Sequence, residues 1–143
     1  EDENAHAASL PSRRGRTSVG AMARRITTDA GRAALAAVAA VREQGGGLPR
    51  AETATAVRYL LQLLVEKAPG GTVEVRVPPY GAVQVIEGPR HTRGTPPNVV
   101  ETDAVTWIDL ATGAKEWGDA AASGRILASG TRADLSALLP LRP

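Results

Sequence analysis

The sequence contains no cysteine, no phenylalanine and no long apolar run, and each absence excludes a class of function. Without cysteine, the 143-residue chain cannot form disulfide bonds, thiolate nucleophiles or cysteine-based metal sites, and a reducing compartment suits it. No run approaches the roughly 18 apolar residues that a membrane-spanning helix needs. We therefore expect a cytoplasmic protein without an integral membrane segment.

The chain also has few aromatic residues and a small net charge. Aromatic residues make up 3% of the chain, so the core must consist of Leu, Val, Ile and Ala, and any internal cavity has aliphatic walls. The net charge of +2 is too small to indicate nucleic-acid binding, for which a clustered basic stripe is expected. The two histidines, His6 and His91, lie far apart in a chain without cysteine, so we predict no metal site and no cofactor.

The first 21 residues carry many charged side chains and almost no large apolar residue. Such a segment cannot bury enough surface to offset the entropy lost on ordering. We predict that residues 1–21 are disordered and that residues 22–143 form one domain, which is long enough for a single core.

Helical periodicity dominates the first part of this domain. Apolar residues recur at spacings of three and four up to about Gln44, after the N-cap candidates Thr27, Thr28 and Asp29. The same spacing recurs over about 50–67, directly after Pro49. Both stretches are predicted to be amphipathic helices.

Strands are predicted next. Residues 72–77 alternate strictly, with Val73, Val75 and Val77 inward, and residues 80–87 form a second strand of an antiparallel hairpin. Shorter strands are predicted at 98–102 and 125–129, and helices at 104–111, 115–123 and 132–139. Asp103 is the predicted N-cap of the first of these helices and Gly113 its terminator. Trp107 and Trp117 lie on apolar helix faces, so we predict that they are core residues rather than a ligand cage. Helices and strands are grouped rather than alternating, which indicates the α+β class.

The loop over residues 88–103 holds the side chains most suited to chemistry. Its His91 could act as a general base, but it has no nearby nucleophile in the sequence, so we favour a structural role. Arg90 and Arg93 could clamp a carboxylate or phosphate group. They could equally pair with acidic residues on either side of the loop, Glu87 and Glu101, and both readings stay open.

A family resemblance is carried by the second half of the chain. Its residues run Thr102-Asp103…Trp107-Ile-Asp-Leu-Ala-Thr-Gly113…Trp117…Ala120…Gly124-Arg-Ile-Leu-Ala-Ser-Gly130…Ala133-Asp-Leu…Leu139-Pro-Leu141. This run resembles the C-terminal part of sterol carrier protein 2-like domains, above all those of small actinobacterial sterol carrier family proteins. It is also similar to the C-terminal domain of mycothiol-dependent maleylpyruvate isomerase. The metal-binding helical domain of that isomerase has no counterpart here.

The resemblance implies a mostly antiparallel sheet of about five strands covered by helices, with an apolar tunnel between them for a sterol or acyl chain. We therefore predict a non-catalytic carrier for an apolar or amphiphilic small molecule. The alternatives are an accessory or catalytic domain that binds a polar thiol or anionic metabolite through the Arg90–Arg93 loop, and a protein-interaction module. The candidate ligand-binding residues are Arg90, His91, Arg93, Asn98, Trp107, Leu61, Leu64, Val83 and Val85, and further wall candidates are Val65, Ile126 and Leu138.

Overall fold

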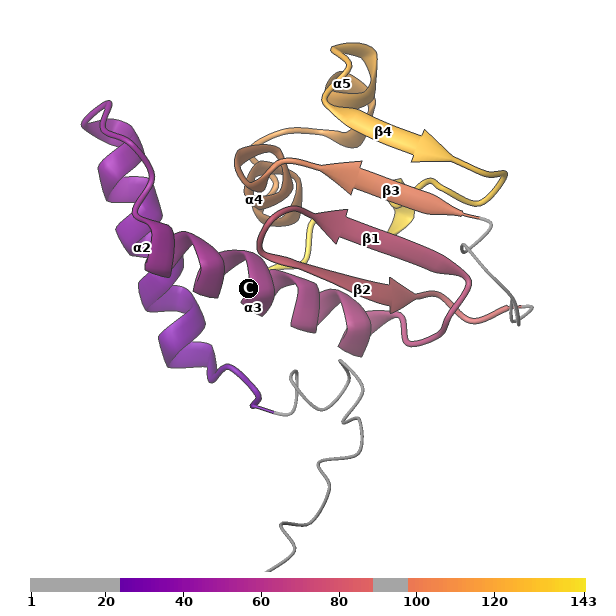
Figure 1. The fold of residues 1–143 in the computed structure, drawn as a ribbon, viewed down its shortest axis with the longest axis horizontal. Helices are drawn as coiled ribbons and strands as arrows, with labels where there is room; N and C mark the ends of the chain where they lie inside the picture. Colours follow the sequence, from indigo (N-terminus) through magenta and orange to yellow (C-terminus); the bar gives the residue numbers. More distant parts are fainter. Residues whose placement is uncertain (1–23, 89–97) are drawn as a thin grey trace, which may run out of the picture.

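The computed structural model describes residues 24–88 and 98–143, where helices pack against one face of a mixed sheet (Figure 1). The predicted disordered tail lies outside these residues. The α+β class is confirmed. In chain order the elements are α2 (Thr28–Glu43), α3 (Arg50–Lys67), β1 (Val73–Val77), β2 (Gly81–Val85), β3 (Val99–Thr102), α4 (Ala104–Thr112), α5 (Trp117–Ala122), β4 (Ile126–Ser129) and the 3-10 turn η1 (Ser136–Leu138).

The sheet has the strand order β2-β1-β3-β4. Its first two strands form the predicted antiparallel hairpin, with Val75 opposite Val83, and β4 is antiparallel to β3. Between them, β3 runs parallel to β1. Parallel neighbours cannot be joined by a tight turn, and in the chain β2 lies between these two strands. The sheet is therefore mostly antiparallel, but the described residues form four strands rather than the five that the resemblance implies.

Alternation along the strands separates a buried face from an open one. Val73, Val75 and Val77 are completely buried, while Glu74 and Arg76 on the other face are partly exposed and form an ion pair. The hydrogen bond that Glu74 accepts from Arg76, together with the negative charge of Glu74, raises the pKa of Arg76. The strands stand uncovered in the view of Figure 1, so the open face is a solvated face.

Helix α3 is the centre of the helical layer and contacts α2, β2 and α4. Helix α2 lies on the outer side of α3 and stands away from the sheet (Figure 1). Arg42 near the end of α2 donates two hydrogen bonds to the carboxylate of Asp109 in α4, at 2.8 and 3.1 Å. This ion pair joins the end of α2 to α4.

The prediction of a last helix over residues 132–139 is wrong. Only the 3-10 turn η1 forms there, with the Asp134 carboxylate accepting a hydrogen bond from the backbone N–H of Ser136 at 2.8 Å. A two-turn helix is marginal by itself, so long-range contacts decide its conformation. Three such contacts hold this segment and the residues after it. The Asn98 amide oxygen accepts from the N–H of Arg132, the Lys67 ammonium donates to the Leu138 carbonyl, and the N–H of Leu141 donates to the Ala111 carbonyl at 2.8 Å.

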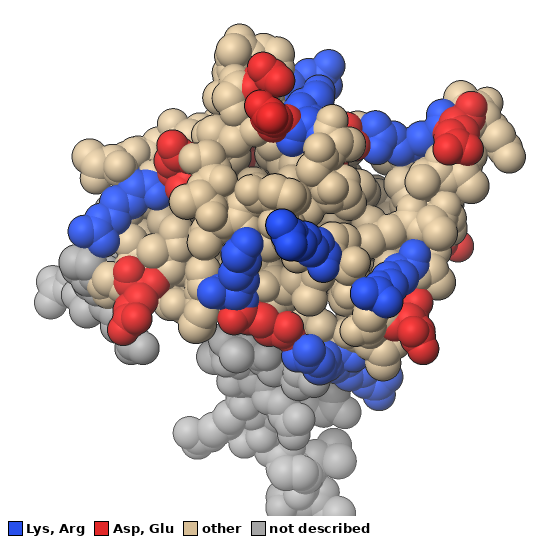
Figure 2. All heavy atoms as spheres, turned by 180° about the vertical axis from the view of Figure 1, so that it is seen from behind, with Lys and Arg blue, Asp and Glu red and all other residues tan. Residues whose placement is uncertain are grey.

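On the face opposite to that of Figure 1, Lys and Arg side chains are interspersed with Asp and Glu (Figure 2). Interspersed charges of opposite sign leave no large field of one sign on this face, and salt screens exposed charges beyond about one Debye length, roughly 8–10 Å. Across the described ranges, no helix is long and apolar enough to cross a membrane.

Candidate functional site

The predicted polar site residues fall largely outside the structure. Arg90, His91 and Arg93 lie in residues 89–97, outside the described residues, and their role stays a prediction. Asn98 is buried, with 5% of its surface exposed. Its amide nitrogen donates to the Thr72 carbonyl at 3.1 Å, and its amide oxygen accepts from the N–H of Arg132 at 2.9 Å. The Asn98 amide thus joins the segment before β1, at Thr72, to the segment after β4, at Arg132.

The predicted aliphatic wall residues lie together in the core between α3, the sheet and α4. Leu61, Leu64, Val83, Val85 and Trp107 are each at most 8% exposed. The indole nitrogen of Trp107 donates to the Val57 carbonyl at 3.3 Å, which fixes the ring under α3. These side chains pack against one another, so a ligand between sheet and helices would have to separate them. Their part in ligand binding stays a prediction.

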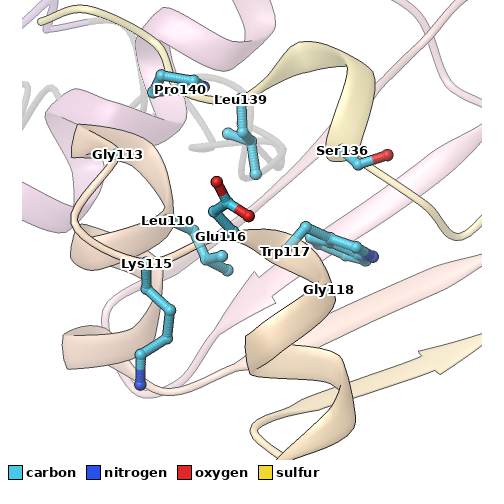
Figure 3. Close-up of a pocket in the computed structure, with 9 residues that line it drawn as sticks. All are labelled: Leu110, Gly113, Lys115, Glu116, Trp117, Gly118, Ser136, Leu139 and Pro140. Carbon is cyan, nitrogen blue, oxygen red and sulfur yellow. The ribbon is translucent and has the colours of Figure 1, made fainter.

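A hollow of about 340 Å³ lies beside this core, between the α4–α5 connection and the C-terminal segment. We call it the α4–α5 hollow (Figure 3). Its lining combines apolar side chains with a few polar ones, as small-molecule sites do. The lining residues are Leu110, Gly113, Lys115, Glu116, Trp117, Gly118, Ser136, Leu139 and Pro140.

The sequence builds one wall of the hollow through the end of α4. Asp103 begins the helix as predicted, because its carboxylate accepts a hydrogen bond from the N–H of Thr106 at 2.8 Å. Gly113 ends it with φ of 89°, a left-handed conformation that favours glycine. A Cβ on Gly113 would lie 3.4 Å from the ring of Pro140, so this glycine also sets how closely the two walls approach.

The opposite wall is the C-terminal segment, which two polar contacts hold against the body. The N–H of Leu141 donates to the Ala111 carbonyl, and the Lys67 ammonium donates to the Leu138 carbonyl at 2.7 Å. Leu139 is partly buried and packs against the core. The hollow therefore lies between two segments that only the folded chain brings together.

Two residues connect the hollow with the interior. Leu110 is 2% exposed and belongs to the core, yet it also lines the hollow. Trp117 was predicted to be a core residue, but it is only partly buried and its ring forms part of the lining. The hollow was not predicted from the sequence, where the available signal was a tryptophan between a glutamate and a glycine, Glu116-Trp117-Gly118.

Two further hollows lie elsewhere on the described surface. One lies at the end of β3 and the start of β4 and contains three charged side chains, Glu101, Asp103 and Arg125. Partial burial by itself would raise the pKa of Asp103, but hydrogen bonds from Thr106 and the charge of Arg125 outweigh it and place this pKa below its ordinary value. The other hollow lies between α2 and α3 and is lined mainly by alanines. In the described parts of the chain, no group of three His, Asp or Glu side chains is placed to hold a metal ion.

Fold and hollow together define a small α+β domain that has helices on one face of its sheet and, beside its core, a hollow of mixed polar and apolar lining. A family model described as "Bacterial SCP ortholog" matches residues 49–141, which is more than half of the chain. The chain therefore belongs to this family of bacterial orthologues of the sterol carrier protein, and the predicted family is confirmed. No curated protein matches the chain.

The matched range contains α3, the whole sheet and the α4–α5 hollow, whereas α2 precedes it. The predicted similarity to the isomerase domain and the predicted actinobacterial source are not tested by this match and stay predictions.

Proposed function

We propose that the protein binds a small apolar or amphiphilic molecule and carries it unchanged, with the α4–α5 hollow as the place where the ligand enters. Membership of the sterol carrier family supports the class of ligand. The observation that carries the proposal is the position of Leu110, which is at once part of the core and part of the hollow lining. An apolar group seated in the hollow would touch the outermost layer of the core.

The lining suits such a ligand. Leu110, Leu139 and the Trp117 ring offer apolar surface, and burying one aliphatic side chain or its equivalent contributes about 1.5–3 kcal/mol. The hollow is open to solvent on its other side, so a polar end of the ligand can stay hydrated. A volume of about 340 Å³ is at the lower end for small-molecule sites, which start at about 300 Å³. The rest of a larger ligand would lie outside the hollow or displace the C-terminal segment.

A titration with a fluorescent acyl probe tests this proposal. We expect saturable binding, and we expect Leu139→Asp to weaken it about tenfold, because the substitution places a charge against the apolar part of the ligand. The matched control is Leu127→Asp. Leu127 is 66% exposed on β4 and lies outside the α4–α5 hollow, so this variant should bind the probe like the wild type.

Thermal unfolding of both variants separates a loss of binding from a loss of fold. Absence of probe binding by the folded wild type would contradict the carrier function. Equal weakening by Leu127→Asp and Leu139→Asp would show that the probe binds elsewhere.

A further inference from the structure

Glu116 stands at the N-cap position of α5 but does not cap the helix. An N-cap residue usually has a short side chain, which accepts a hydrogen bond from a backbone N–H of the first turn. The side chain of Glu116 makes no such bond. Its carboxylate points instead toward the wall of the α4–α5 hollow that Leu139 and Pro140 form (Figure 3).

No basic group among the described residues neutralises this carboxylate. The ion pairs there are Arg25–Glu66, Arg42–Asp109 and Arg76–Glu74, none of which includes it. The neighbouring Lys115 also lines the hollow, but its side chain extends in the opposite direction, away from Leu139 (Figure 3). Of the two charged side chains that line the hollow, Glu116 is therefore the one that points toward the wall of Leu139 and Pro140.

Apolar surface adjoins this charge on the same hollow. Leu110 and the Trp117 ring line the same hollow as Glu116 (Figure 3). A carboxylate accepts hydrogen bonds but donates none when ionised. An anionic group placed here would meet a like charge, whereas a hydroxyl or an ammonium group would find an acceptor.

We propose that the ligand of the α4–α5 hollow is an apolar body that carries a hydrogen-bond donor, either a hydroxyl or a protonated amine, and that Glu116 accepts this donor. The inference rests on the proposed carrier function and specifies its ligand. It differs from the anionic head group that an arginine clamp in the Arg90–Arg93 loop would select. The carboxylate is exposed to solvent, so its contribution to the selection of an amine is limited to about fivefold.

Competition against the fluorescent acyl probe tests the inference. The competitors are a primary alkylamine, the primary alcohol and the carboxylate of one medium chain length, at a pH where the amine is protonated and the acid ionised. With the wild-type protein we expect the amine and the alcohol to displace the probe at lower concentrations than the carboxylate, by about fivefold for the amine.

Glu116→Gln removes the charge and keeps an acceptor oxygen. We expect this variant to lose the preference for the amine over the carboxylate, while its affinity for the alcohol stays within about twofold. Asp119→Asn is the matched control, because it removes a negative charge from the first turn of α5 at a residue outside the hollow lining. It should leave the order of the three competitors unchanged.

The outcomes separate this inference from the proposed function. A carboxylate that competes best with the wild type, or an order that Glu116→Gln leaves unchanged, would overturn the donor preference while the carrier function stands. The order in which the three competitors displace the probe from the wild type tests the donor preference even if Glu116→Gln is unstable. Failure of the acyl probe and of all three competitors to bind would overturn both.

Discussion

Gly31 is the residue through which α2 is seated on α3. A Cβ built at this position would lie 2.3 Å from the Tyr59 ring, which is 2% exposed and cannot move aside freely. Helix propensity alone would make Gly31→Ala stabilising by about 1 kcal/mol, but overpacking costs about 1–3 kcal/mol. We expect the overpacking to win and the variant to be destabilised by about 1–2 kcal/mol, measured by urea unfolding.

The control for this prediction is the same substitution at a helical glycine with free space. A Cβ on Gly118 in α5 would meet nothing within 4 Å. Gly118→Ala should therefore stabilise the protein by about 0.5 kcal/mol. A stabilising Gly31→Ala would show that α2 does not rest on Tyr59 as described.

The two tryptophans show how far helical spacing predicts the burial of a side chain. Both Trp107 and Trp117 lie on apolar helix faces, and both were predicted to be in the core. Trp107 is buried at 1% exposure, whereas Trp117 lines the hollow. Helical spacing tells which side faces inward but not how completely another segment covers it. The covering segment here, residues 136–140, lies far along the chain.

At the scale of elements, α4 depends on its N-terminal residue. The carboxylate of Asp103 accepts hydrogen bonds from both the N–H and the hydroxyl of Thr106. We expect Asp103→Ala to cost about 1 kcal/mol in the free energy of unfolding. The ionised form is favoured in the folded protein, since the pKa of Asp103 lies below the ordinary value of 3.8. Its stabilisation is therefore complete above that value and is lost as the pH falls through the lower, folded pKa.

Urea unfolding at several pH values checks this prediction. The difference between wild type and Asp103→Ala should be constant near neutral pH and shrink below about pH 4. Asp103→Asn is the control, because asparagine caps helices about as well but does not titrate. A stability difference between wild type and Asp103→Ala that is independent of pH would contradict the capping role of the charge.

The elements that the sequence predicted correctly are those with strong local signals. The alternation of Val73, Val75 and Val77 fixed β1 and its buried face, and Asp103 and Gly113 marked the ends of α4. The parallel pairing of β1 with β3 was not predicted, because alternation identifies a strand but not its partner. The leucines at 135, 138 and 139 matched helical spacing, yet long-range hydrogen bonds hold that segment mostly outside a helix.

At the scale of the whole molecule, the family domain and the site coincide. The family match begins at residue 49, so the sheet and both walls of the α4–α5 hollow belong to the common domain. The hollow could not be predicted from the sequence, because its walls around Trp117 and Leu139 meet only after α4, α5 and the C-terminal segment have packed. The class of ligand could be predicted from the family resemblance, but the location of the hollow could not.

Native mass spectrometry can show whether this domain holds an apolar or amphiphilic molecule, as we propose. The protein would be purified without detergent and measured before and after extraction with organic solvent. We predict a bound mass that is lost on extraction, belongs to a molecule with an apolar body and is reduced in Leu139→Asp. A protein that carries no such mass, and that takes up no acyl probe after extraction, would contradict the proposed carrier function.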